Sequence, residues 1–377
     1  VARTLGCGPW RSFAAVALPL ARPAIVSGLA LALMETLNDF GTVQYFAVDT
    51  FTTGLYRTWF GLGEPAAAAQ LGAVLMLFVL ALLLVERLSR GRARFGHTTT
   101  RLKPLKRLTL RPLPALGAML LCLVPVLLGF LLPAALLLTW TLQTAFTSLD
   151  AAFLRHAGHS LMLAAVAALV AVAVGLLLAY GQRLKPAPGV RWAVRVAGLG
   201  YAVPGAVIAV GTLLPCAWAD NSIDAWMRLH FGVSTGLLLS GTITALVYAY
   251  CVRFLAVSLN TVEASLGKVT PSMDAAARSL GESRLGVLKR VHLPLVRGSL
   301  LTAGLLVFVD VMKELPATLI LRPFNFDTLA IRAYQMASDE RLRDAAAPGL
   351  AIVAVGILPV ILLSMGIARS RPGRKRD

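Results

Sequence analysis

The sequence predicts an all-α membrane protein, a polytopic helical bundle built from two tandem parallel repeats, and three observations lead to this prediction. First, 57% of the 377 residues are hydrophobic and only 14% are charged, whereas about a quarter of the residues in soluble domains are charged. Second, apolar runs of about 20 residues, long enough to cross a hydrocarbon core as helices, recur along the chain. Third, one motif occurs twice, at the first residues and again near Arg278.

The apolar runs are expected to form spanning helices rather than barrel strands. They are rich in Leu, Ala and Val and do not alternate between polar and apolar residues, and a lone helix satisfies its own backbone hydrogen bonds in lipid. The expected spans are 20–41, 68–88, 115–139, 158–180, 198–215, 236–256, 298–318 and 348–368.

The net charge of +18 follows from membrane topology. If each span crosses the membrane once, one side holds residues 1–19, 86–114, 181–197, 257–297 and the tail from 369. These segments carry most of the 36 Lys and Arg residues but few of the 18 acidic residues. The positive-inside rule therefore places this side in the cytoplasm. Because topology accounts for the basic excess, we expect the lipid membrane and no nucleic acid as a partner.

The repeated motif indicates an internal duplication. The matched pairs, aligned without a gap, are Arg3 with Arg278, Gly6 with Gly281, Pro19 with Pro294, Glu35 with Asp310, and Asp39 with Glu314. Both copies of the motif lie on the cytoplasmic side, immediately before a span. The repeats are therefore parallel, related by an axis near the membrane normal.

The second copy of the motif is predicted to form a helix-turn-helix elbow on the cytoplasmic face. Thr270 and Pro271 can start a short helix, and Asp274 is placed against its positive end. Gly281 supplies the left-handed residue that closes this helix, and a second short helix runs to Pro294. Such an elbow is suited to turning a push from a cytoplasmic partner into movement of a span. The alternative is an ordinary amphipathic element in the membrane interface.

The stretch DAAARSLGESRLGVLKRVHLPL resembles the EAA loop of importer permeases of the ATP-binding cassette (ABC) class. The motif of that family is Glu-Ala-Ala, three residues, Gly, nine residues, Ile, one residue and Leu-Pro. The Glu position holds Ala275 here, with Asp274 one residue earlier. A narrower resemblance to the fused, double-length permeases of bacterial ferric-iron importers lies in METLNDFGTVQYFAVDTFTTGLYRTWF and DVMKELPATLILRPFNFDTLAIRAYQ.

The resemblance implies the type I ABC importer permease fold and a set of partners. In that family one polypeptide supplies both membrane halves, a periplasmic protein delivers Fe(III), and separate ATPase subunits, expected as a homodimer, dock on the two EAA loops. Residues 1–90 would be the C-terminal part of the first half, 91–112 a basic linker, and 113–377 the second half, with its EAA loop at 257–297. We expect a fragment whose upstream part is missing, from a bacterial inner-membrane protein with its EAA loops, linker and C-terminus in the cytoplasm.

The resemblance also indicates which residues couple the permease to its ATPase. They are Arg3, Gly6, Pro19, Asp274, Ala276, Arg278, Gly281, Glu282 and Pro294. The chain has no GxxxxGK[ST] phosphate loop, so the partner is expected to use ATP and Mg, and this chain is expected to bind no cofactor and catalyse no reaction. Related permeases for thiamine, phosphonates or polyamines share the EAA loop. A gradient-driven secondary transporter is the other alternative, but it needs no docking surface for an ATPase.

Four carboxylates within the spans are candidates for lining a translocation path. They are Glu35, Asp39, Asp310 and Glu314. The two members of each pair are four residues apart and share one helix face. Carboxylates in a membrane are destabilising unless they line water or find partners, and hard cations prefer carboxylate oxygen. The alternative is that they are hydrated near the outer end of each span or lock helices together, with Lys313 pairing with one of them.

Two outer regions complete the interpretation. His156 and His159 have a spacing that can hold a metal, but two His in a short loop are more often solvated, and no metal ligand is assigned. The segments 42–67 and 319–347 are expected to form the docking surface for the periplasmic binding protein.

Overall fold

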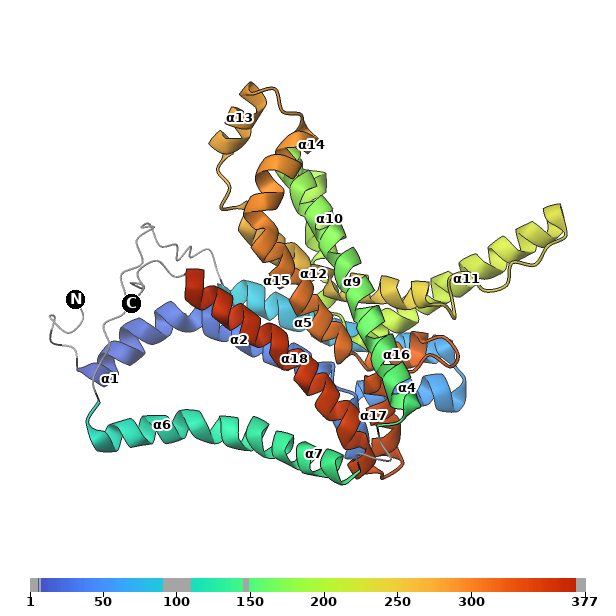
Figure 1. Cartoon of the computed structure of the whole chain (residues 1–377), viewed down its shortest axis with the longest axis horizontal. Helices are drawn as coiled ribbons and strands as arrows, with labels where there is room; N and C mark the ends of the chain where they lie inside the picture. The colour runs from blue at the N-terminus through green and yellow to red at the C-terminus, as the bar shows by residue number, and fades with distance from the viewer. Residues whose placement is uncertain (1–5, 7, 91–109, 145–148, 371–377) are drawn as a thin grey trace. The chain divides into compact units, whose positions relative to one another are not determined.

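The computed structural model describes residues 6, 8–90, 110–144 and 149–370, and every regular element within them is helical (Figure 1). Arg3, most of the expected linker and the tail from residue 371 lie outside the described residues. Within the described part, 7 helices are long and apolar enough to cross a membrane, and an eighth span results if the bent pair Trp10–Arg22 and Ala24–Leu37 counts as one. The prediction of an all-α polytopic membrane protein is confirmed.

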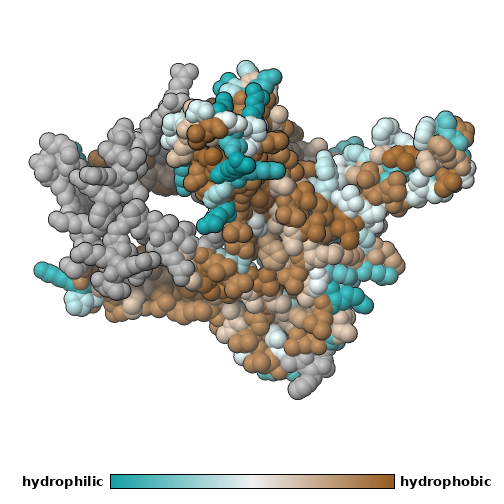
Figure 2. All heavy atoms as spheres, turned by 45° about the horizontal axis from the view of Figure 1, so that its top comes forward, coloured by the Kyte–Doolittle hydropathy of each residue, from teal (hydrophilic) through white to brown (hydrophobic). Residues whose placement is uncertain are grey.

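The chain divides into two compact units. One comprises residues 1–39 and 74–136, and the other comprises residues 40–73 and 137–377. Hydrophobic residues cover much of the visible face in Figure 2, as expected for helices whose outer sides meet lipid.

The first unit contains a long interrupted helix. Its parts are α1 (Pro9–Ser12), the π-helical turn η1 (Phe13–Ala17) and α2 (Leu18–Leu37), and the unit also holds the end of α5 (Pro65–Arg90), α6 (Pro112–Val126) and the π-helical turn η3 (Leu127–Leu131). The Ser27 hydroxyl on α2 donates to Glu86 Oε1 on α5 at 3.0 Å. This bond gives the buried Glu86 side chain a polar partner within an apolar stretch.

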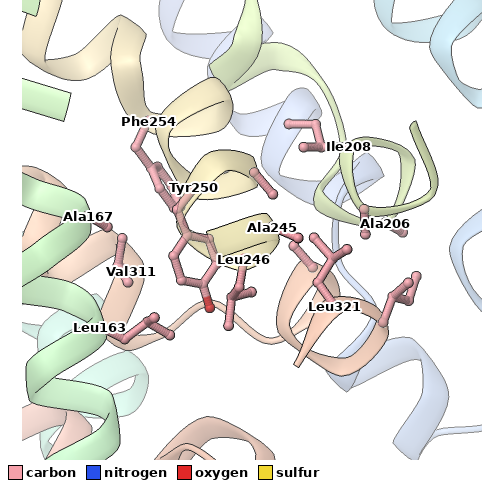
Figure 3. Close-up of a cluster of buried hydrophobic side chains, with 14 of the residues drawn as sticks. Leu163, Ala167, Ala206, Ile208, Ala245, Leu246, Tyr250, Phe254, Val311 and Leu321 are labelled. Atoms are coloured by element: carbon pink, nitrogen blue, oxygen red, sulfur yellow. The ribbon is translucent and has the colours of Figure 1, made fainter. Parts of the chain in front are cut away.

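The second unit is built around three long helices, α9 (Ala151–Leu184), α12 (Ile243–Leu266) and α15 (Leu293–Met312). Small residues let these helices approach closely. Ser258 Oγ on α12 donates to the Ala171 carbonyl of α9 at 2.7 Å, and a Cβ on Gly175 would lie 2.6 Å from the same Ser258 oxygen. Figure 3 shows the core beside this contact, where Tyr250 of α12 projects among side chains from its neighbours.

Other helical elements complete the described part of the chain. The remaining described elements are α3 (Gly41–Tyr45), α4 (Phe51–Tyr56), η2 (Arg57–Leu62), α7 (Leu132–Gln143), α10 (Pro188–Ala197), η4 (Gly200–Ala202), α11 (Gly205–Phe231), α13 (Pro271–Ser279), α14 (Arg284–Val287), η5 (Leu288–His292), α16 (Pro316–Leu321), α17 (Leu329–Ser338) and α18 (Leu342–Ser370).

The expected span 198–215 differs most from the structure. The chain forms α10, a short turn and then α11, which begins after Pro204 and continues to Phe231. Figure 1 shows α11 extending away from α9, α12 and α15. Its last turns are held by the returning segment, whose backbone N–H groups donate to Asp220, as from Ser240 at 2.7 Å, and to Asp224, as from Thr235 at 2.7 Å. These carboxylates support a helix where the sequence alone indicates a loop.

Candidate functional site

The second copy of the repeated motif forms the predicted elbow. We call residues 271–292, from α13 through η5, the second elbow. Helix α13 begins at Pro271, directly after Thr270 at the N-cap, although the Thr270 side chain makes no capping hydrogen bond. Gly281 has φ +87°, the left-handed conformation that ends α13 and turns the chain. Ser283 then caps α14 by accepting the Gly286 N–H at 3.1 Å.

The first copy repeats this geometry over its described residues. Gly6 has φ +80°, close to the value at Gly281. We call residues 6–17 the first elbow. With Arg3 aligned to Arg278, the bounds of α1, η1 and α2 fall on those of α14, η5 and α15 without a shift at either end. The duplication therefore extends from sequence to backbone conformation.

Each elbow enters its span through a π-helical turn just before a proline. The Leu18 N–H donates to the Phe13 carbonyl and the Leu293 N–H to the Leu288 carbonyl, one residue farther back than in an α-helix. Pro19 and Pro294 follow directly, and they have no N–H to donate to the preceding turn. Wide turns of this kind occur often at functional sites.

The Asp274 side chain is directed into the protein. It lies in the first turn of α13, as expected, but its carboxylate binds Arg183 Nε at 3.0 Å and lies 2.7 Å from His292 Nε2. Burial acts to raise the pKa of the Asp274 carboxyl, but the hydrogen bonds from Arg183 and His292 outweigh it, and the pKa lies below its usual value. The expectation that Asp274 couples to an ATPase remains a prediction, and the structure gives it an internal partner.

The outer surface of the second elbow combines apolar and charged side chains. Leu280, beside the turn, is 85% exposed, and Leu285 is also exposed. Arg278 and Ala276 are exposed on α13, and Glu282 forms an ion pair with Arg290. In Figure 2 hydrophilic side chains gather where α13 and α14 come forward. An exposed leucine at a rigid turn, framed by charges, is a surface that a partner protein can cover.

The four candidate path carboxylates differ in their surroundings. Asp310 pairs with Lys313 at 3.2 Å, an interaction that the sequence anticipated, and Lys313 is half exposed. Glu35 is exposed and Asp39 is partly buried. Glu314 is only 5% exposed. Lining of a translocation path by these residues remains a prediction, and among the described residues no group of three or more His, Cys, Asp or Glu could hold a metal ion.

Glu314 belongs to a buried junction of three segments. Its Oε1 accepts from Arg253 of α12 at 3.1 Å and from the Ala317 N–H of α16 at 3.0 Å. Gly205, the first residue of α11, lies against both side chains, since a Cβ there would be 2.0 Å from the Arg253 guanidinium. Arg253 lies near the end of the expected span 236–256, and this position alone does not reveal its role. The available signal was an arginine within the apolar run 236–256.

The two histidines lie within α9 rather than in a loop. His156 is buried, and His159 stacks on Phe326 with ring centroids 4.2 Å apart. His159 Nδ1 lies 3.1 Å from the Asp327 carbonyl. The expectation that both are solvated is therefore wrong, because α9 begins at Ala151 and includes both residues. His156 is buried there, and His159 contacts the loop before α17.

A polar cavity of about 490 Å³ lies between α3 and α17. Its lining includes Gln44, Tyr45, Tyr334, Ser338 and Glu340. These residues come from the two segments, 42–67 and 319–347, that the sequence analysis assigned to the docking of a binding protein. The cavity offers amide, hydroxyl and carboxylate oxygens, which are the donors preferred by hard cations.

Two elbows of matching backbone geometry each lead into a spanning helix of an all-α bundle. Residues 1–94 match the family described as the binding-protein-dependent transport system inner membrane component. The probable molybdenum ABC transporter permease protein of Haloferax volcanii is 31% identical over 54% of this chain and 71% of its own length. The chain belongs to this family, the membrane permeases of ABC transporters.

Within the family, the chain is similar to permeases named for ferric iron. It is 27% identical to the Fe(3+)-transport system permease protein FbpB 2 of Haemophilus influenzae over 96% of this chain and 69% of that protein. It spans 52% of the length of two further ferric permeases. The resemblance inferred from the motifs is confirmed.

The fold is that of a solved ABC importer. A crystal structure of a bacterial alginate ABC transporter in complex with an alginate-bound periplasmic protein matches 66% of this chain and 92% of that chain, with a TM-score of 0.53 and 15% identity. At this identity the likeness concerns the fold alone, and it agrees with the expected ABC permease architecture.

Proposed function

We propose that this chain is part of the membrane permease of an ABC importer that carries Fe(III) from a periplasmic binding protein into the cytoplasm. The observation that supports this best is the pair of equivalent elbows, each with a left-handed glycine and a π-helical turn in front of a proline-started span. The identity of the cargo is supported by the ferric permeases that match nearly the whole chain.

The proposed mechanism assigns energy conversion to a partner. A separate ATPase, expected as a homodimer using ATP and Mg, docks on Leu280 and the charged residues around it. Its closure pushes the second elbow, and the helical connection through η5 passes the displacement to α15. The first elbow passes a corresponding displacement to α2, and the two spans switch the path between outward and inward access.

The binding protein is proposed to deliver its cargo at the cavity between α3 and α17. Glu340 supplies a carboxylate at this cavity, and Tyr334 and Tyr45 supply phenolic oxygens. This arrangement provides oxygen donors at the entrance while no tight metal site forms among the described residues. Weak binding suits a pathway, because an ion that is held tightly is not released.

The test is uptake of radioactive Fe(III) into proteoliposomes that contain the full-length permease with its ATPase, supplied with the binding protein and ATP. We expect accumulation that requires all three proteins and ATP. If the binding protein stimulates ATP hydrolysis and iron stays outside, the importer assignment stands and the cargo is wrong. In that case molybdate and 2-aminoethylphosphonate are the next substrates, since permeases named for both match part of this chain. Hydrolysis that never responds to the binding protein would contradict the importer itself.

A further inference from the structure

Arg183, in the last turn of α9, joins three segments through one side chain. Its Nε donates to Asp274 Oδ2 at 3.0 Å, and its terminal nitrogens donate to the carbonyls of Leu266 and Val269, each at 2.8 Å. Leu266 ends α12, Val269 lies in the link that follows, and Asp274 is in the first turn of α13. The guanidinium therefore fixes the end of α9 to the first arm of the second elbow.

Tyr180, three residues earlier on the same face of α9, holds the other arm. Its hydroxyl donates to the Arg284 carbonyl in α14 at 2.6 Å, and its ring meets the His292 ring edge-on with centroids 5.4 Å apart. His292, in η5, is 1% exposed and lies 2.7 Å from Asp274 Oδ1. These contacts close a ring from α9 to α13, from α13 to η5, and back to α9.

The ring contains buried charged groups that would destabilise the fold if they lost their partners. The side chains of Arg183 and Asp274 are 19% and 14% exposed, and removal of one member of a largely buried ion pair leaves the other charge without compensation. An apolar cluster next to the ring, with Ala179 of α9, Val262 of α12 and Val296 of α15, packs the three spans together. The second elbow and the ends of these three helices therefore form one connected body.

The first elbow differs at the decisive position. Ala17 stands where the second elbow has His292, and Ala17 is exposed. A methyl group can neither hydrogen-bond a carboxylate nor pack edge-on against a tyrosine ring. The part of the ring that depends on His292 therefore has no counterpart in the first elbow.

We propose that Arg183 is a positioning residue that locks the second elbow to α9, so that a push on this elbow moves α9 together with α15. The inference rests on the proposed function and adds to it a residue outside the EAA loop. In this arrangement Asp274 binds Arg183 and His292 inside the protein, and the exposed face around Leu280 makes the contact with the ATPase. Without the lock, the ATPase still docks and hydrolyses ATP, but the displacement is absorbed within a loosened elbow.

The decisive quantity is the amount of Fe(III) taken up per ATP hydrolysed by the full-length transporter in proteoliposomes with its ATPase and binding protein. We expect Arg183→Gln and Asp274→Asn each to lower this ratio by about tenfold while ATP hydrolysis continues. The double variant should be little worse than the more severe single variant, because each substitution already breaks the contact between Arg183 and Asp274 on which the lock depends. Arg183→Lys, which keeps the charge, should recover part of the ratio. Lys185→Gln, at an exposed neighbour on the same helix end, is the matched control and should leave the ratio unchanged.

A purely structural role predicts a different result, in which uptake and hydrolysis fall together at a constant ratio, and this would overturn the inference. Hydrogen exchange of residues 271–282 provides a second measurement that does not depend on iron. We expect faster exchange in Arg183→Gln than in Lys185→Gln, and equal exchange would also overturn the inference. If the unmodified transporter moves no iron but its elbow exchanges as expected, the cargo is wrong and the lock stands.

Discussion

Gly205→Ala tests the buried junction at the start of α11. A Cβ at this position would lie 2.0 Å from the Arg253 guanidinium, 2.6 Å from Glu314 Oε1 and 3.2 Å from Pro316 Cβ. Real Cβ atoms essentially never approach heavy atoms this closely, so the Arg253–Glu314 ion pair must separate or α11 must shift. Overpacking in a core destabilises by about 1–3 kcal/mol, and breaking a buried ion pair by about 3–5 kcal/mol. Alanine recovers at most about 1 kcal/mol through its helix propensity. We therefore expect Gly205→Ala to lower the free energy of unfolding by about 3 kcal/mol.

The assay is thermal unfolding of the purified full-length permease in detergent, followed by loss of the monodisperse species. Gly211→Ala is the matched control, because Gly211 lies on the same helix and a Cβ there would meet no atom within 4 Å. The control should unfold at the temperature of the unmodified protein or slightly above, whereas Gly205→Ala should unfold several degrees lower. Equal unfolding temperatures for the two variants would refute the reasoning.

Four further substitutions probe other parts of the site. Gly281→Val places a β-branched residue at φ +87°, a conformation that such residues avoid. The variant should still insert into the membrane, but ATP hydrolysis should no longer drive uptake. Normal transport by this variant would rule out the elbow mechanism. Glu314→Gln breaks a buried ion pair and should lower the free energy of unfolding by about 3–5 kcal/mol, and with it the unfolding temperature. Asp310→Asn, whose partner Lys313 is half exposed, should slow Fe(III) uptake without this loss of stability. Equal unfolding temperatures for the two variants would contradict this contrast. Glu340→Gln removes the carboxylate from the cavity between α3 and α17. It should raise severalfold the concentration of loaded binding protein needed for half-maximal uptake, and an unchanged concentration would exclude this cavity as the delivery site.

The elbows could be predicted from the sequence because their determinants are local. Gly281 ends a helix by its own conformation, and Pro271 and Pro294 fix helix starts through their ring geometry. Neither effect needs knowledge of distant residues. For the same reason, the ungapped sequence alignment of the two copies also aligns the ends of their helices.

The internal partners of the elbow could not be predicted in this way. The contact of Arg183 with Asp274 joins residues 91 positions apart, and the contact of Arg253 with Glu314 joins residues 61 positions apart. Each arginine fits the expected gathering of basic residues on one side of the membrane. Only the packing of α9, α12 and α15 selects the carboxylate that each one meets.

Helix α11 shows how a nonlocal interaction changes the extent of an element. Asp220 and Asp224 lower the hydropathy of the segment after residue 215, so the expected span stops there. In the folded chain these carboxylates accept hydrogen bonds from the returning backbone, including the N–H groups of Leu239 and Gly236. A carboxylate that accepts hydrogen bonds from a neighbouring segment can therefore lie within a helix instead of ending it.

The π-helical turns carry information about the history of the protein. A π turn holds one residue more than the α turn that it replaces, and in both halves this surplus residue lies within the five positions before Leu18 and Leu293. The internal duplication accounts for this shared register, because two copies of one segment carry the surplus residue at the same place. The side chains at the turn differ, since Ala17 stands where the second elbow has the buried His292. The two halves therefore share one hinge geometry and hold it with different side chains.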